Sequence, residues 1–319
     1  MNTRFTRFCA IGAGLALAFT VAACGGSDSD AAAPSADGVT RMTLSIPPVG
    51  DSLPVYVALE NGFFADNGLE IELAPAANGA TTINALISGS TDLALVSYPS
   101  LIKAVDSKLP VAIAAMGIDG TDEYKAGIYV PEGSAVKTPA DLIGKKVATP
   151  SLGSVGDIYF RGVLKDENLD YTKVNFVELP QANMATALKA GDVDAAFITE
   201  PTLSSAVKTL DLRAIGYQNG PQGVFATSTK TIDSNPDAIR GFRTALAQAV
   251  EVIEVDPHGV ASQIMPTYTD MDAETARNMN LPQFVTEWNA DDVQSVIDLM
   301  VEVGIIKQSF SADNLFQPL

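Results

Sequence analysis

The sequence ALISGSTDLALVS at residues 85–97 has a second copy, ALKAGDVDAAFIT, at residues 187–199. In each copy an Ala-Leu pair ends a helix, a glycine stops it, and an apolar strand follows an aspartate and closes on a hydroxyl residue. The correspondence continues upstream in two more pairs of segments, 44–50 with 147–153 and 66–69 with 166–169. Three elements at nearly one offset favour an internal repeat over chance convergence of common patterns. The sequence therefore predicts two similar α/β lobes with a cleft between them.

Length and composition agree with two packed domains and exclude some partners. The chain has 319 residues, 47% of them hydrophobic, and is too long for most single cores. Acidic residues outnumber basic ones by 38 to 20, for a net charge of −18. No basic patch is visible, so no nucleic-acid partner is expected. The same balance argues against a ligand held by a strong cluster of cations and otherwise indicates solubility.

The N-terminus has the pattern of a signal peptide. Arg4 and Arg7 supply a positive region, and residues 9–19 form an apolar stretch that is too short for a comfortable membrane span. We therefore expect residues 1–23 to be removed from the mature protein.

A cysteine stands directly after this region. Residues 21–24, VAAC, resemble a bacterial lipobox, in which the cysteine is diacylated and becomes the mature N-terminus. Two or three acyl chains on Cys24 would anchor the protein stably to the membrane, and ordinary cleavage near Ala23 is the alternative. Residues 24–39 are rich in Gly, Ser, Asp and Ala and have little to bury, which is typical of a flexible tether.

Catalytic and metal-binding patterns have little support in the sequence. No cysteine follows Cys24, which leaves no disulfide, thiolate nucleophile or cysteine metal site. His258 is the only histidine and stands at a predicted helix start, so a Ser-His-Asp triad is not expected. The sequence shows no P-loop, no dinucleotide-binding glycine pattern and no acidic cluster with metal-ligand spacing. We expect no catalytic residue, no metal and no cofactor.

The predicted elements alternate between strand and helix before the chain becomes helical. In the first lobe, residues 40–122, we expect strands at 42–46, 69–73, 93–97 and 111–116 and helices at 53–67, 80–88 and 100–106. In the second lobe, 123–222, we expect strands at 127–130, 146–149, 174–179, 195–199 and 213–217. Residues 223–319 are predicted to return to the first lobe as helices, and the lobes are connected near 117–125 and 218–223.

Polar, small and aromatic residues gather near the ends of the predicted strands, where open α/β sheets bind ligands. The candidate ligand-binding residues are Val49, Gly50, Asp51, Ser52, Gly79, Thr81, Ser97, Tyr98, Ser151, Gly153, Ser154, Tyr159, Thr199 and Glu200. Ser151, Ser154 and Thr81 belong to helix starts, whose free N–H groups can bind an anion, although capping alone explains each of them.

Four other candidates have equally plain alternatives. Tyr98 and Tyr159 could form stacking walls of a site or belong to the core. Asp51 and Glu200 could accept a ligand amine or be solvated residues of the rim.

Several segments together carry a family resemblance. They are NGFF at 61–64, DLIGKKV at 141–147, the Ala-Leu…Gly…Asp patterns at 85–92 and 187–194, and Glu-Pro at 200–201. In order and spacing, the region 44–201 resembles the periplasmic substrate-binding proteins of nitrate, sulfonate and taurine transporters and of thiamine-pyrimidine-precursor transporters. The resemblance implies a two-lobed Venus-flytrap fold of type II, each lobe a doubly wound sheet with flanking helices. It also implies delivery of a small-molecule ligand to an ABC permease and its ATPase.

The resemblance leaves the ligand open. A small organic anion similar to a sulfonate or taurine is the first expectation, and a pyrimidine or aromatic solute is the second. Eukaryotic pyrimidine-synthase relatives carry a cysteine-rich motif and a sacrificial histidine, and this chain has no suitable cysteine. An enzyme on the same scaffold would have to use Asp157, Glu200 or Asp51, and a sensory lipoprotein is a third class. The first expectation is a lipid-anchored, extracytoplasmic, monomeric binding protein without enzymatic activity.

Overall fold

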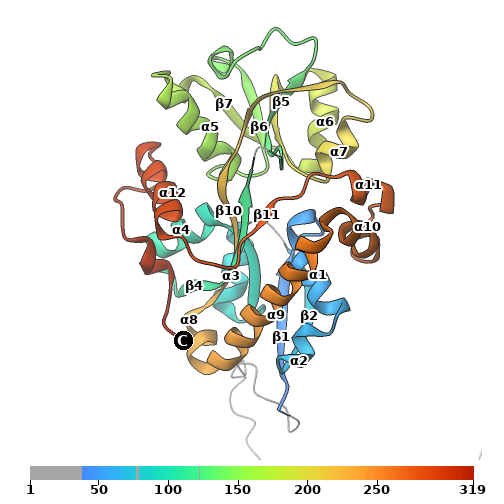
Figure 1. The fold of residues 1–319 in the computed structure, drawn as a ribbon. Coiled ribbons are helices and arrows are strands. Elements are labelled where there is room, and N and C mark those ends of the chain that lie inside the picture. The colour runs from blue at the N-terminus through green and yellow to red at the C-terminus, as the bar shows by residue number, and fades with distance from the viewer. Residues whose placement is uncertain (1–37, 77–78, 122) are drawn as a thin grey trace, which may run out of the picture. The chain divides into compact units, whose positions relative to one another are not determined.

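Two β-sheets with helices on both faces make up the part of the chain that the computed structural model describes, residues 38–76, 79–121 and 123–319 (Figure 1). The predicted signal peptide, Cys24 and all but the last two residues of the predicted tether lie outside these ranges. The described residues fall within one compact unit. Within them, no helix has both the length and the apolar character needed to cross a membrane.

The first sheet has the strand order β11-β4-β10-β3-β1-β2. Its strands are β1 (Thr40–Ile46), β2 (Leu69–Pro75), β3 (Leu93–Ser97), β4 (Val111–Gly120), β10 (Gly220–Ser228) and β11 (Gln283–Phe284). β1 is parallel to β2 and β3, whereas β10 is antiparallel to β3 and β4. Helices α1 (Leu53–Glu60), α2 (Phe63–Asp66) and α9 (Pro236–Val255) pack on one face. Helices α3 (Gly79–Ser88), α4 (Tyr98–Asp106) and α12 (Ala290–Glu302) pack on the other.

The second sheet has the order β7-β6-β8-β5-β9. Its strands are β5 (Gly127–Pro131), β6 (Lys146–Thr149), β7 (Asn175–Glu178), β8 (Ala195–Ile198) and β9 (Leu212–Tyr217). Helix α5 (Val155–Asp166) packs on one face, and α6 (Gln181–Ala190) and α7 (Thr202–Ala206) pack on the other (Figure 1). These sheets confirm the predicted two-lobed α/β fold of type II.

The duplicated stretch has the same physical role in both lobes. Its glycine has a φ of 75° in the first copy and 77° in the second, a left-handed conformation that favours glycine and ends the helix. Its aspartate, which stands just before β3 in one lobe and β8 in the other, then ties that strand to its parallel neighbour, β1 or β6. Asp92 Oδ2 accepts a hydrogen bond from Thr43 N at 2.8 Å, and Asp194 Oδ2 accepts one from Lys146 N at 2.9 Å. The parallel cores β2-β1-β3 and β7-β6-β8 consequently have matching orders.

The single helix predicted at 53–67 is wrong, because two helices occupy this region. α1 ends at Glu60, and α2 (Phe63–Asp66) begins after Gly62, whose φ is 75°. A residue in this left-handed conformation cannot continue an α-helix, so the chain turns before the second helix starts. The apolar spacing alone did not reveal this break.

The two segments that connect the sheets are shorter than the ranges predicted for them. β4 continues to Gly120 instead of ending near residue 116, and residues 220–223 belong to strand β10 of the first sheet. Glycines in these strands permit very close approach of the backbones. A Cβ on Gly117 would lie 2.3 Å from the carbonyl oxygen of Gly223. The glycines at 117 and 223 therefore belong to tightly paired strands.

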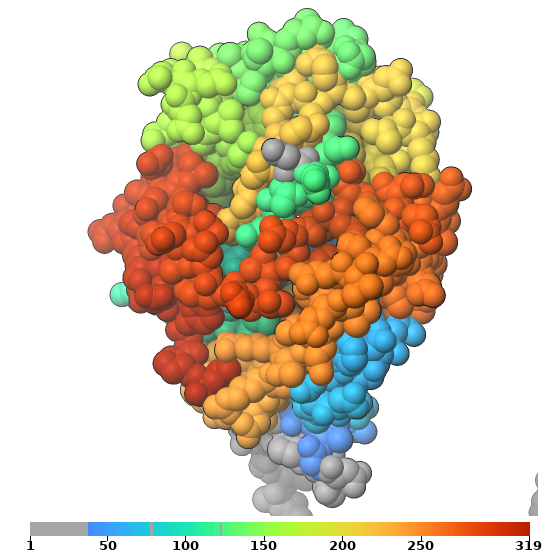
Figure 2. All heavy atoms as spheres, in the orientation of Figure 1, coloured from blue at the N-terminus to red at the C-terminus, as the bar shows by residue number. Residues whose placement is uncertain are grey.

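The C-terminal helices contact both lobes. They are α8 (Thr229–Ser234), α9, α10 (Pro257–Tyr268), α11 (Ala273–Asn278) and α12, and Figure 2 shows that the orange-to-red residues cover much of one face. α9 packs on the first lobe as predicted, through Ile239, Phe242 and Leu246. Two other helices reach the second lobe, where Lys208 Nζ donates to Thr275 Oγ1 and Lys165 Nζ pairs with Glu302 Oε2, both at 2.8 Å.

Short 3-10 helices complete the described structure. They are η1 (Gly50–Ser52), η2 (Pro139–Leu142), η3 (Tyr171–Lys173) and η4 (Ala312–Leu315). Thr138 is the N-cap of η2, and the Asp141 carboxylate accepts hydrogen bonds from the N–H groups of Lys137 and Thr138. Burial of Leu142 under this turn anchors it to the second lobe.

Candidate ligand-binding site

A cavity of about 540 Å³ is lined by residues of both lobes. Its size lies within the range of about 300–1,000 Å³ that is usual for small-molecule sites. The first lobe contributes residues that follow β1, the end of β3, parts of α3 and α4 and the start of β10. The second lobe contributes the loop before α5, the start of α6 and the end of β8. Several of these are carboxyl ends of strands and N-terminal ends of helices, where open α/β sheets bind ligands.

Half of the residues predicted from the sequence line this cavity. The lining residues among them are Asp51, Gly79, Ser97, Ser151, Gly153, Ser154 and Thr199. They come from both lobes, so the structure brings together positions that lie up to about 150 residues apart in the sequence.

The other half do not line the cavity: Val49, Gly50, Ser52, Thr81, Tyr98, Tyr159 and Glu200. A Cβ on Gly50 would lie 2.6 Å from Met279 Cε, and Ser52 Oγ donates to the Pro47 carbonyl at 2.7 Å. Tyr98 is 4% exposed within the core, and Tyr159 packs edge-to-face on Phe160. Thr81 is exposed and Val49 half-buried outside the lining.

Glu200 is a structural cross-link in this arrangement. Its carboxylate is 2% exposed and accepts hydrogen bonds from the N–H and hydroxyl of Ser204. It also accepts from the N–H of Asn280 at 3.2 Å and from its Nδ2 at 2.6 Å. The four donors leave this buried carboxylate well satisfied, and they join the end of β8 to the segment after α11.

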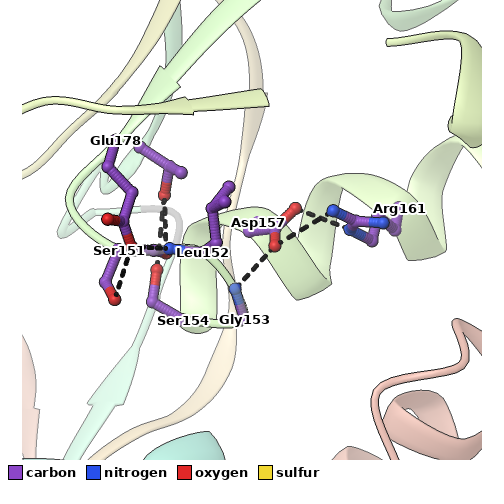
Figure 3. Close-up of polar contacts among 8 residues, drawn as sticks. Ser151, Leu152, Gly153, Ser154, Asp157, Arg161 and Glu178 are labelled. Carbon is purple, nitrogen blue, oxygen red and sulfur yellow. Dashed lines mark hydrogen bonds and ion pairs between the residues drawn. The ribbon is translucent and has the colours of Figure 1, made fainter. Parts of the chain in front are cut away.

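The predicted anion cradle before α5 is partly occupied by side chains of the protein (Figure 3). Gly153 N donates to Asp157 Oδ2 at 2.7 Å, and Leu152 N donates to Glu178 Oε1 at 2.8 Å. Ser151 Oγ also points to Glu178 Oε1, at 3.3 Å. The N–H groups of residues 152 and 153 are therefore committed to carboxylates of the same lobe.

The donors that remain lie in the first turn of α5. Val155 and Gly156 both line the cavity, and within the described chain their N–H groups have no hydrogen-bond acceptor. Ser154 is the N-cap residue, but its hydroxyl contacts Thr149 Oγ1 at 3.3 Å instead of capping the helix. The open N–H groups and the positive end of the helix dipole favour a negative ligand group.

Lys103 is the cation of this cavity, and the sequence analysis missed it. It lies on α4, and a Cβ on Gly153 of the other lobe would be 3.3 Å from its Nζ. Within the described residues it has neither an ion pair nor a hydrogen bond through its side chain. Ser100, one helical turn earlier on α4, lines the cavity as well.

Two acceptors face the cavity as well. Asp51 Oδ1 accepts a hydrogen bond from Tyr124 OH at 2.7 Å. Burial raises the pKa of Asp51 to about 6, against the opposing effects of this bond and of a backbone hydrogen bond. Gln181 donates through Nε2 to the Phe197 carbonyl at 3.3 Å, while its buried Oε1 has no partner in the described part of the chain. A ligand N–H group could satisfy these acceptors.

The described residues place no group of three or more His, Cys, Asp or Glu side chains where they could hold a metal ion. Phe197 is the only aromatic residue among the described lining of the cavity. Its ring packs directly beneath the start of α5, where a Cβ on Gly156 would lie 2.4 Å from Phe197 Cγ. The site therefore offers donors with one cation, acceptors with one carboxyl group, and little aromatic surface.

Comparison with solved structures places this geometry in a known fold. The periplasmic aliphatic sulphonate binding protein of Escherichia coli superposes with a TM-score of 0.72 at 20% identity, covering 88% of this chain and 92% of that one. The periplasmic nitrate-binding protein of Synechocystis gives a TM-score of 0.69 at 19% identity, covering 87% and 84%. At these identities the likeness shows the fold.

The sequence relatives match different shares of this chain and of their own lengths. A formylaminopyrimidine-binding protein of Halalkalibacterium halodurans is 28% identical over 44% of this chain and 41% of its own length. A putative ABC transporter periplasmic binding protein of Brachyspira hyodysenteriae is 25% identical over 80% and 76%, and the taurine-binding periplasmic protein of Escherichia coli is 22% identical over 64% of each. The family model described as NMT1/THI5 like matches residues 50–259, which is more than half of the chain. The chain belongs to the NMT1/THI5-like family, in agreement with the resemblance inferred from its sequence.

Proposed function

We propose that the protein is the extracytoplasmic solute-binding component of an ABC importer and captures a small organic anion between its lobes. This proposal rests on three hydrogen-bond donors that have no acceptor in the part of the chain that the structure describes and lie in one cavity. They are the Lys103 ammonium group of the first lobe and the N–H groups of Val155 and Gly156 of the second. All three line one cavity, and the lysine has no acidic partner among the described residues. The names of the relatives, which include periplasmic binding proteins for taurine and for sulphonates, support the same role.

Binding would work by closure of the two lobes. A ligand that contacts Lys103 and the start of α5 at the same time gains affinity only when both lobes surround it, so it favours the closed state. No bond is made or broken in this cycle. The lobes proposed from the sequence, 40–122 with 223–319 and 123–222, would be the moving bodies, with residues 220–222 assigned to the first lobe because β10 begins there.

The acceptors refine the ligand class. Asp51 and the unpartnered Oε1 of Gln181 would take an amine or amide N–H, so a ligand with an anionic end and a donor end, such as taurine, matches the cavity best. A pyrimidine is the second candidate, since its amino groups could also meet these acceptors and one relative is named for a formylaminopyrimidine. Tyr98 and Tyr159 lie away from the cavity, which weakens the stacking argument for it.

Membrane attachment and partners complete the proposal. Cys24 would carry the lipid, residues 24–39 would form the tether, and the monomer would pass its ligand to a permease driven by an ATPase. A lipoprotein that passes the solute to a receptor is the competing role. Adding the protein to proteoliposomes that contain the cognate permease and ATPase separates the two, because only the transport role increases ligand uptake.

The test of the site is a thermal-shift and calorimetric screen against taurine, alkanesulfonates, nitrate and pyrimidines. A ligand at a hundred times its dissociation constant should stabilise the fold by about 2.7 kcal/mol. Lys103→Gln should then weaken binding of an anionic hit about tenfold or more, since a charge-assisted contact is lost. Lys189→Gln, which removes an exposed lysine outside the cavity, is the matched control. Equal affinities in the two variants would refute the anion site, and a response to pyrimidines alone would move the assignment to the second candidate.

A further inference from the structure

A second cavity, of about 150 Å³, lies among β4, β10, α9 and the segment that follows β11. It shares no lining residue with the ligand-binding cavity. Aromatic rings supply much of its wall, from Phe225, Phe284, Trp288 and Phe316, and Leu246 and Val250 of α9 add aliphatic surface. The cavity is therefore mainly apolar and separate from the cleft.

One charged side chain lines this apolar cavity. Arg243 projects from α9, and its guanidinium donates to the carbonyl oxygens of Ala114 and Ile113 on β4 through Nε and one Nη nitrogen. No carboxylate among the described residues pairs with it, whereas Arg240, one turn earlier, pairs with Asp237. Burial lowers the pKa of Arg243, and the neighbouring Arg240 lowers it further. An uncompensated cation in such a position would gain from a negative partner.

The second Nη nitrogen of Arg243 is available to donate hydrogen bonds to a ligand. Its N–H groups have no acceptor within the described chain, and a guanidinium presents donors in a planar fork that suits a carboxylate. The cavity has the size of an engineered apolar cavity, also about 150 Å³, that binds benzene. Size, lining and charge together define one class of occupant.

We propose that this cavity is a second binding site, which takes an apolar monocarboxylate with a benzene-sized body. The carboxylate pairs with Arg243, and the body packs among Phe225, Phe284 and Trp288. The occupant would contact the strand pair β4–β11, where Val285 N donates to the Gly117 carbonyl at 2.9 Å. Binding at this site would be independent of the solute in the cleft.

The chain contains a built-in reporter for this site. Trp288 is its only tryptophan, it lines the second cavity, and its ring centroid lies 4.3 Å from that of Phe316. Titration of the full chain with benzoate should therefore change the tryptophan fluorescence saturably. Benzylamine and benzyl alcohol should bind about tenfold or more weakly, because neither offers a negative charge to Arg243.

Matched variants test whether Arg243 binds a ligand or only stabilises the fold. Arg243→Gln should weaken benzoate binding about tenfold or more, whereas Arg240→Gln and the cleft variant Lys103→Gln should stay within about twofold of the wild type. Val250→Phe, which fills the cavity and keeps the arginine, should abolish the signal and decides the question if Arg243→Gln does not fold. The proposal is overturned by the absence of a saturable change in the folded wild type, by equal binding of benzyl alcohol, or by equal losses in the two arginine variants.

Discussion

Replacing Glu200 with alanine should destabilise the protein strongly and leave ligand affinity unchanged. The carboxylate is 2% exposed and accepts four hydrogen bonds, two from Ser204 and two from Asn280. A hydrogen bond to a charged group contributes about 1.5–3 kcal/mol, and an unsatisfied buried donor costs about 1–3 kcal/mol. Because these contributions overlap and Asn280 is half-buried, we expect a loss of about 3–5 kcal/mol in the free energy of unfolding. At roughly 2–4 °C per kcal/mol for a chain of this size, the melting temperature should fall by about 10 °C.

Equilibrium urea unfolding of Glu200→Ala, Asn280→Ala and the double variant measures the contact between them. Groups that share hydrogen bonds should give a coupling free energy of about 1–3 kcal/mol. Glu200→Gln, which keeps the shape and one acceptor oxygen, should cost less than the alanine variant. A coupling below about 0.5 kcal/mol would refute the cross-link. A tenfold loss of affinity for a hit of the ligand screen at unchanged stability would instead return Glu200 to the binding site.

Three further predictions concern the cleft, the repeat and the paired glycines. Burial raises the pKa of Asp51 to about 6 from 3.8, so the folded protein should lose stability as pH rises from about 4 to 6. Asp51→Asn should therefore reduce the difference between the urea midpoints at pH 5 and pH 7. An unchanged difference would contradict the raised pKa. Asp194→Ala should cost about 1–2 kcal/mol in urea unfolding, because it removes the hydrogen bond to Lys146 N; a neutral result would mean that the repeated aspartate does not tie the strands. Gly117→Ala should lower the free energy of unfolding by about 3 kcal/mol or more, since the new Cβ would collide with the backbone of β10. Gly133 has open space around it, so Gly133→Ala should change the stability by less than about 0.5 kcal/mol. Similar changes in melting temperature for both variants would refute the close pairing.

Local signals of the sequence predicted most of the strands and helices, because each depends on neighbours in the chain. The glycine and aspartate of the repeat end a helix and pair with the first strand, so their spacing appears in both lobes. Strand β6 has the predicted bounds. Strand β10 was missed, since its glycines and proline resemble a loop and only its partners β3 and β4 make it a strand.

The candidate site was predicted less well than the fold, for a related reason. Residues at strand ends were expected to face the ligand, but tertiary packing decides which of them do. Tyr98 turns into the core, and Glu178 and Asp157 occupy N–H groups that the sequence offered to an anion. Lys103 gained its importance only from the second lobe, whose Gly153 lies beside its ammonium group. No pattern local to α4 identifies such a contact across the cleft.

The position of β10 has a consequence for the order in which the two lobes fold. All five strands of the second sheet lie between residues 127 and 217, so that lobe can form once this contiguous region is complete. The first sheet cannot, because β10 lies between β3 and β4 and is made only after the whole second lobe. Until then β3 and β4 each expose an unpaired edge, which invites wrong pairing or aggregation. The N-terminal lobe would therefore finish folding last, and slow insertion of β10 would limit the rate at which the protein matures.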